Sequence, residues 1–151
     1  MNHTLHSKRL LVVDDDPAVL ALTATVLRGL PGSEVVPCDN PRQALDIFMA
    51  DPESFEMLVT DFNMPSLDGI ELSRRIHLQS PQLRVLLISG GGLETAEVIR
   101  AGLDAFLSKP WRADELVEIV RRVLADQCDI SEKWTPRQPE GGPRPPARKR
   151  C

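Results

Sequence analysis

The stretch Met57-Leu-Val-Thr-Asp-Phe-Asn-Met-Pro-Ser-Leu-Asp-Gly69 decides the fold that we predict for this chain. It begins with an apolar run, which is typical of a strand buried on both faces of a parallel sheet, and we expect that strand over residues 56–60. Asp61 ends the strand, where a carboxylate is poorly placed for packing but well placed for chemistry. The alternative is that Asp61 caps the following turn, because Asp is a common turn residue.

The same alternation of a short apolar run and a helical repeat occurs five times along the chain. The other strands are expected over residues 9–13, 34–38, 83–89 and 105–108. Helices are expected over residues 17–30, from 41, over 69–77, over 93–101 and over 112–126. In the first helix, helical spacing falls on Val19, Leu22, Val26 and Leu30. Strands that alternate with helices over short connections predict an α/β fold, with a five-stranded parallel sheet and helices on both faces.

Four of the five predicted strands end in polar side chains. In parallel sheets of this kind, sites lie beyond the carboxyl ends of the strands. Three adjacent carboxylates repel one another, so a bound cation would explain them, whereas capping of the next helix explains only the last of the three. The polar side chains are the acidic cluster Asp14, Asp15 and Asp16, followed by Asp61, Ser89 and Lys109.

An acidic cluster, a separate carboxylate, a hydroxyl and a lysine at one sheet edge suit phosphoryl transfer. Two carboxylates and a turn carbonyl can hold Mg²⁺, which uses few protein ligands and keeps several waters. The remaining carboxylate can then attack phosphorus, because the metal offsets the charge repulsion. The lysine and the hydroxyl can bind the oxygens of the transferred group.

At these positions the sequence resembles the receiver domains of two-component response regulators, including the single-domain chemotaxis regulator. The resemblance spans about residues 8–126. It implies a flavodoxin-like receiver fold with the strand order 2-1-3-4-5 and a cis peptide before Pro110. Four short motifs carry it: Val12-Val13-Asp14-Asp15, Thr60-Asp61-Phe62-Asn63-Met64-Pro65 with Asp68-Gly69, Ile88-Ser89-Gly90, and Ser108-Lys109-Pro110.

The resemblance also implies which residues handle the phosphoryl group. Asp61 matches the phospho-acceptor, Lys109 the lysine that pairs with the phosphoryl group, and Ser89 the hydroxyl that hydrogen-bonds it. Phe106 matches the switch aromatic, which is commonly Tyr in the family, so it can rotate inward but offers no hydroxyl. The family commonly has Ala after the hydroxyl residue, whereas this chain begins a run of three glycines at residues 90–92.

The metal ligands follow from the same resemblance. Asp14 and Asp15 match the acid pair that binds Mg²⁺ together with Asp61, and Asp15 is the expected direct ligand of the pair. Asn63 matches the position whose backbone carbonyl joins them. Asp16 falls one place beyond the pair, and we expect it to cap the next helix. Mg²⁺ is therefore the expected cofactor.

The function implied is phosphoryl transfer onto Asp61 from a phosphohistidine of a sensor kinase or phosphotransfer protein. The surface of the last two helices and the fifth strand would then switch, for binding of a downstream protein or for homodimerisation. Such a protein catalyses only its own phosphorylation and dephosphorylation. One alternative is a phosphate sink in a phosphorelay. Others are a degenerate receiver used only for docking, which the complete set of site residues disfavours, and a small Mg²⁺-dependent phosphatase-type enzyme. The three glycines at residues 90–92 give the enzyme alternative little support, because the Gly-Lys-Ser/Thr that completes a phosphate loop does not follow them.

Charge and composition exclude several classes of function. Residues 1–130 carry 12 basic and 20 acidic side chains, so we expect the domain itself not to bind nucleic acid. No apolar run reaches the length of a signal sequence or a membrane span, which predicts a protein without membrane attachment. The three cysteines form no zinc motif and, being an odd number, suit a reducing cytoplasm; they are Cys38, Cys128 and Cys151.

The chain is expected to divide into three parts. Residues 1–7 form a flexible N-terminus, and residues 8–129 form the receiver domain. Residues 130–151 are rich in proline and carry six basic and two acidic side chains, so we expect a disordered basic tail. The alternative for the tail is a peptide that binds a membrane surface, nucleic acid or an acidic partner. No second folded domain is predicted within these residues.

Overall fold

The computed structural model describes residues 8–91 and 93–125. The predicted flexible N-terminus at residues 1–7 and the predicted disordered tail at residues 130–151 lie outside the described residues. The same holds for residue 126, the predicted end of the last helix.

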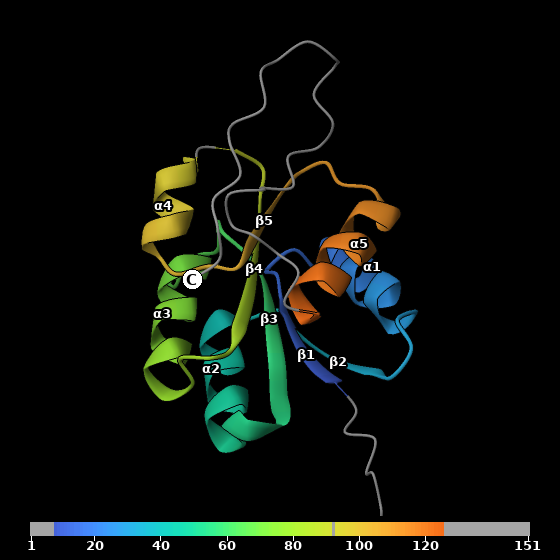
Figure 1. The fold of residues 1–151 in the computed structure, drawn as a ribbon. Helices are drawn as coiled ribbons and strands as arrows, with labels where there is room; N and C mark the ends of the chain where they lie inside the picture. The colour runs from blue at the N-terminus through green and yellow to red at the C-terminus, as the bar shows by residue number, and fades with distance from the viewer. Residues whose placement is uncertain (1–7, 92, 126–151) are drawn as a thin grey trace, which may run out of the picture.

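Five parallel strands form one sheet, in the order β2-β1-β3-β4-β5. Figure 1 shows this sheet at the centre of the molecule, between two layers of helices. The predicted five-stranded parallel sheet and its 2-1-3-4-5 order are confirmed. The strands are β1 (Lys8–Val13), β2 (Ser33–Cys38), β3 (Phe55–Asp61), β4 (Arg84–Ser89) and β5 (Ala105–Ser108).

Helices cover both faces of the sheet. On one face α2, α3 and α4 lie together, and on the other α1 and α5 lie side by side (Figure 1). A short 3-10 helix, η1, precedes β3. The bounds are α1 (Pro17–Arg28), α2 (Pro41–Ala50), η1 (Pro52–Ser54), α3 (Gly69–Gln79), α4 (Thr95–Arg100) and α5 (Ala113–Leu124).

The central strands are apolar on both faces because each face packs against helices. In β1, Leu11 and Val13 belong to the core under α2, α3 and α4, whereas Leu10 and Val12 belong to the core under α1 and α5. All four are at most 1% exposed. Since successive side chains of a strand point to opposite faces, the middle of a strand between two cores is apolar at consecutive positions. This packing explains the unbroken apolar runs of the sequence.

The buried face of α1 is not the one that the helical spacing indicated. Leu22, which belonged to that spacing, is 56% exposed. The buried face instead combines two leucines with Thr23 and Ala24, and the hydroxyl of Thr23 is satisfied by donating to the Val19 carbonyl at 2.8 Å. The polar Thr23 interrupts the apolar pattern of this face in the sequence. The buried residues of α1 are Leu20, Thr23, Ala24 and Leu27.

The helix α4 is shorter than the predicted span of 93–101. It begins at Thr95 because Glu94 caps it: the Glu94 amide donates to the carboxylate of Glu97 at 2.9 Å. The chain turns away after Ala101 through Gly102, which has a φ of +71°. Among the described residues, no helix has the length and apolar character needed to cross a bilayer.

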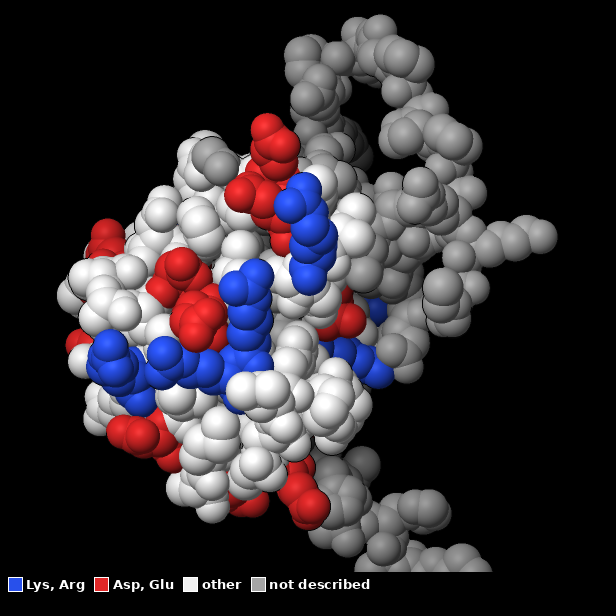
Figure 2. Space-filling view, turned by 90° about the vertical axis from the view of Figure 1, so that its left-hand side faces the viewer, with Lys and Arg blue, Asp and Glu red and all other residues white. Residues whose placement is uncertain are grey.

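Figure 2 shows the face on the α3 and α4 side, with basic and acidic side chains close together. Within α3, the Arg75 Nε lies 3.1 Å from a carboxylate oxygen of Glu71, and Arg74 lies 3.9 Å from the other oxygen of the same carboxylate. The band of Lys and Arg side chains on this face is therefore bordered and partly paired by acids. This face is not a continuous basic surface.

Candidate functional site

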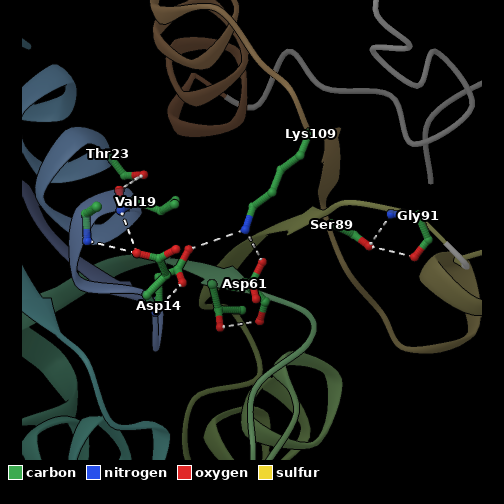
Figure 3. A network of polar contacts seen from close by, with 10 residues as sticks. Asp14, Val19, Thr23, Asp61, Ser89, Gly91 and Lys109 are labelled. Carbon is green, nitrogen blue, oxygen red and sulfur yellow. Dashed lines mark hydrogen bonds and ion pairs between the residues drawn. The ribbon is translucent and has the colours of Figure 1, made fainter.

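Three strands bring two carboxylates and an ammonium group to one point at the C-terminal edge of the sheet (Figure 3). Asp14 follows β1, Asp61 ends β3, and Lys109 follows β5. The Lys109 Nζ lies 2.8 Å from Asp61 Oδ1 and 3.6 Å from Asp14 Oδ2. Both carboxylates are buried, at 5% and 6% exposure. The lysine therefore bridges two buried acids that are 47 positions apart in the sequence.

The acidic cluster after β1 consists of two acids that lie at the site and one that caps α1. One ligand oxygen each from Asp14, Asp15 and Asp61 lie within 4.8 Å of one another, and Asp15 is exposed. Asp16 instead caps α1, because its carboxylate accepts from the Ala18 amide at 2.9 Å and from the Val19 amide at 3.3 Å. The prediction that Asp16 is the helix cap is thus confirmed.

The charges at this site perturb one another. Burial raises the pKa of Asp14; the hydrogen bond from the Asp16 amide opposes this shift, and the negative charge of Asp61 adds to it. For Lys109, burial lowers the pKa, but the hydrogen bond to Asp61 and the charges of both carboxylates outweigh burial, so that the pKa is raised. Lys109 is therefore a cation at neutral pH, and its charge faces the carboxylates of Asp14 and Asp61.

The main chain of Asp61 is fixed by the start of α3. A β-carbon at Gly69 would overlap the Asp61 carbonyl oxygen and would lie 2.8 Å from a methyl group of Leu87. The Gly69 amide donates to the Phe62 carbonyl at 3.0 Å, and the Phe62 amide donates to the Ile88 carbonyl at 2.8 Å. Only glycine allows this approach. The sequence marked Gly69 as a helix start, but it gave no sign of the contact with Asp61.

The loop between β3 and α3 places Asn63 two residues beyond Asp61, with an exposed side chain. Met64 and Leu67 are buried and anchor the loop in the core under α2, α3 and α4. Ser66, between these anchors, has a φ of +70°. A left-handed conformation costs a non-glycine residue about 1 kcal/mol or more. The buried anchors therefore hold the loop in a strained turn beside the acids.

Ser89 is the last residue of β4 and is 1% exposed. Its hydroxyl donates to the Gly91 carbonyl at 3.1 Å and accepts from the Gly91 amide at 3.2 Å. Figure 3 shows these contacts on the side of Ser89 away from Asp61. The structure thus brings Asp14, Asp15, Asp61 and Lys109 together, but it turns the Ser89 hydroxyl toward the loop that follows β4.

Phe106 lies on β5, opposite Leu87 of β4 in the strand register. It is half-buried and packs against the core under α2, α3 and α4. The peptide between Lys109 and Pro110 is cis, as the resemblance implied. The Lys109 amide also donates to the Ser89 carbonyl at 2.8 Å, so the ends of β4 and β5 are tied together at the site.

Comparison with known proteins agrees with this geometry. The family model of the response regulator receiver domain matches residues 10–121. Response regulator protein FleR of Pseudomonas aeruginosa is 35% identical over 131 residues, which are 85% of this chain and 27% of that protein. The C4-dicarboxylate transport transcriptional regulatory protein DctD of the same organism is 36% identical over 129 residues, which are 84% of this chain and 27% of that protein. The chain therefore spans about a quarter of the length of these two relatives.

Solved structures show the same fold. A receiver domain protein (CheY-like) from Methanospirillum hungatei superposes with a TM-score of 0.72 at 29% identity, covering 80% of this chain and 95% of that one. A receiver domain protein from Clostridium thermocellum gives a TM-score of 0.73 at 25% identity, covering 80% and 96%. Given this fold, the matched family model and these relatives, the chain belongs to the response regulator receiver domain family of two-component systems.

Proposed function

We propose that this receiver accepts a phosphoryl group on Asp61 from a phosphohistidine of a sensor kinase or phosphotransfer protein. One observation carries the proposal: the buried Asp61 carboxylate lies 2.8 Å from the Lys109 ammonium and within 4.8 Å of ligand oxygens of Asp14 and Asp15. Grouping buried acids around one lysine costs electrostatic energy, and groups of this kind are concentrated at functional sites.

The donor set fits Mg²⁺. Asp14, Asp15 and Asp61 offer carboxylate oxygens, the hard ligands that this ion prefers, and three protein ligands suit an ion that retains several of its waters. By resemblance, Asn63 supplies a backbone carbonyl. When bound, the ion offsets the negative charge of the carboxylates and of the phosphoryl group that approaches them.

The chemical step belongs to Asp61. One carboxylate oxygen forms a bond to phosphorus while the bond between phosphorus and the donor's imidazole nitrogen breaks, and the electron pair of that bond returns to the imidazole. Lys109 already holds Oδ1 of Asp61, which orients the carboxylate and leaves Oδ2 for attack. After transfer, the same ammonium can pair with a phosphoryl oxygen, because charge-assisted hydrogen bonds favour the dianionic group.

Phosphorylation would be signalled to other proteins by a change in the surface that α4, β5 and α5 form. Ser89 and Phe106 couple the site to this surface: the Ser89 hydroxyl hydrogen-bonds the phosphoryl group, and Phe106, half-buried on the edge strand β5, rotates inward. A downstream protein, or a second copy of this chain, then binds the altered surface. Phosphorylation would shift the population between two conformations rather than create a new one.

Labelling with acetyl phosphate and Mg²⁺ tests the proposal. Intact mass should show one added phosphoryl group on the wild type and none on Asp61→Asn, and the label should be acid-labile. The matched control is Asp46→Asn, because Asp46 is an exposed acid on α2. Labelling of Asp61→Asn at the wild-type stoichiometry would refute the assignment. Steady turnover of a phosphate ester would favour the enzyme class instead.

A further inference from the structure

We propose that Gly91 is a positioning residue that holds the Ser89 hydroxyl in a resting position, and that this contact breaks when Ser89 hydrogen-bonds a phosphoryl group. The inference rests on the proposed function of Asp61. It concerns how readily the site responds to phosphorylation, which the roles of Asp61 and Lys109 leave open.

The hydroxyl of Ser89 cannot serve both partners at once. It has a single proton, and in this structure it donates that proton to the Gly91 carbonyl at 3.1 Å. The Gly91 amide donates back to the same oxygen at 3.2 Å. Ser89 is 1% exposed, so water does not readily reach its hydroxyl, whereas Gly91 is exposed and its backbone groups can be solvated once they are released. A hydrogen bond from Ser89 to a phosphoryl oxygen therefore requires the loss of the bond to the Gly91 carbonyl.

The main chain of Ser89 is held while its side chain exchanges partners. Ser89 pairs with Ser108 in the register of β4 and β5, and its carbonyl accepts from the Lys109 amide at 2.8 Å. Movement of the hydroxyl must therefore come from side-chain rotation, with release of Gly91 as its counterpart. When Gly91 is released, the loop that leads from β4 to α4 loses a tether at its start.

The resting contact needs glycine at position 91 because of its backbone conformation. Gly91 has a φ of +144°, a region that residues with side chains rarely adopt. Space is not the constraint, since a β-carbon at Gly91 would meet no atom within 4 Å. The neighbouring Gly90 has equally open space around its Cα and no positive φ. The two glycines thus form a matched pair, in which the same added methyl group strains only position 91.

Titration with beryllofluoride in the presence of Mg²⁺ measures the effect of the contact, because this complex mimics the phosphoryl group without turnover. Gly91→Ala should lower the apparent Kd for beryllofluoride by roughly fivefold, since the strain of alanine at a positive φ weakens only the resting state. Gly90→Ala should keep the wild-type Kd. Equal Kd values for Gly91→Ala and the wild type, or the same shift in both variants, would overturn the proposal.

A double-mutant cycle shows whether Gly91 acts through the hydroxyl. In the Ser89→Ala background there is no hydroxyl to release, so Gly91→Ala should leave the beryllofluoride Kd unchanged. A Gly91→Ala effect that persists in this background would mean that the loop acts without Ser89, which contradicts the proposal.

NMR of the wild type gives a readout that needs no variant at position 91. The Gly91 amide resonance should shift when beryllofluoride is added, because that amide loses its bond to Ser89 Oγ, and Ser89→Ala alone should shift the same resonance. An unmoved Gly91 resonance in both experiments would refute the contact. Failure of the proposed function looks different: the wild type would take no label from acetyl phosphate, and Asp61→Asn would bind beryllofluoride as tightly as the wild type.

Discussion

The side chain of Lys109, which follows β5, contacts Asp61 at the end of β3 at 2.8 Å, although these two strands are not neighbours in the sheet. Strand β4 lies between them, and Ser89 at its end is tied to Lys109 through the main chain at 2.8 Å. The ammonium group therefore reaches over β4 to the acids, and the charge pair links β3 to β5 across the site.

The first prediction concerns the stability that this pair contributes. Lys109→Met should lower the free energy of unfolding by about 2 kcal/mol at neutral pH, because it leaves two buried carboxylates without their shared cation. The pKa of Lys109 is raised in the folded state above its ordinary 10.5. Its stabilisation is thus complete below pH 10.5 and is lost as the pH rises through the raised value. Urea unfolding of both proteins, without Mg²⁺, should show a difference that shrinks above that pH.

A second prediction concerns the metal. The double variant Asp14→Ala, Asp15→Ala should bind Mg²⁺ more weakly by roughly tenfold or more, because two oxygen ligands are removed. Fluorescence of Trp111 can follow the titration, since this residue comes directly after Lys109-Pro110. A Trp134→Phe background removes the second tryptophan of the chain. An Mg²⁺ affinity that is the same with and without the two acids would contradict the ligand set.

A third prediction tests the contact between α3 and the main chain of Asp61. Gly69→Ala should lower the free energy of unfolding by about 1–3 kcal/mol, because its methyl group would overlap the Asp61 carbonyl oxygen. Labelling of Asp61 by acetyl phosphate should also slow, since the carboxylate moves with its backbone. Gly90→Ala is the control, as its methyl group enters open space. Equal stability of Gly69→Ala and Gly90→Ala would contradict the prediction, because it would show that α3 can shift to accommodate the methyl group without disturbing Asp61.

A fourth prediction concerns the strained turn after Asp61. Ser66→Gly should be more stable than Ser66→Ala by about 1 kcal/mol, because only glycine adopts the φ of +70° without penalty. Thermal unfolding of the two variants side by side measures this difference. Ser66→Ala as stable as Ser66→Gly would mean that the turn relaxes to an ordinary conformation.

The fifth prediction separates a switch from a phosphate sink. Addition of beryllofluoride and Mg²⁺ should shift the ring resonances of Phe106 and the amide resonances of α4 and α5, if phosphorylation changes the output surface. Amides at the N-terminal ends of the strands, such as that of Arg9, serve as an internal control. Changes confined to the loops around Asp61 would favour a phosphate sink.

The sequence was sufficient for the sheet and for most of the site because both depend on local signals. Unbroken apolar runs mark strands that are covered on both faces, and each such run ends next to a polar residue. The order of the strands came from the resemblance, since periodicity carries no information about which strands are neighbours. The cap at Asp16 was predictable because it depends on residues two and three positions away.

Features that depend on contacts between distant segments were not predictable. The buried face of α1 includes Thr23. Its polar side chain predicts an exposed position, but its hydroxyl forms a hydrogen bond within the helix, which allows it to be buried. The requirement for glycine at position 69 arises from the carbonyl of Asp61, eight residues earlier on another element. The hydrogen bonds between Ser89 and Gly91 form with a φ of +144° at Gly91, and three consecutive glycines do not specify that angle.

The close approach of Gly69 to Asp61 makes one part of the site rigid. The backbone of Asp61 cannot shift, whereas the part of the site around Ser89 is free of this contact. On the Asp61 side, main-chain packing fixes the backbone of the proposed phospho-acceptor, so substitutions there are expected to impair the chemical step itself. On the Ser89 side, the proposed balance between the two states depends on one side-chain rotation and one loop angle. A designer who wanted a sensor with a different threshold or a different signal lifetime would therefore vary residue 91 and leave the acids untouched.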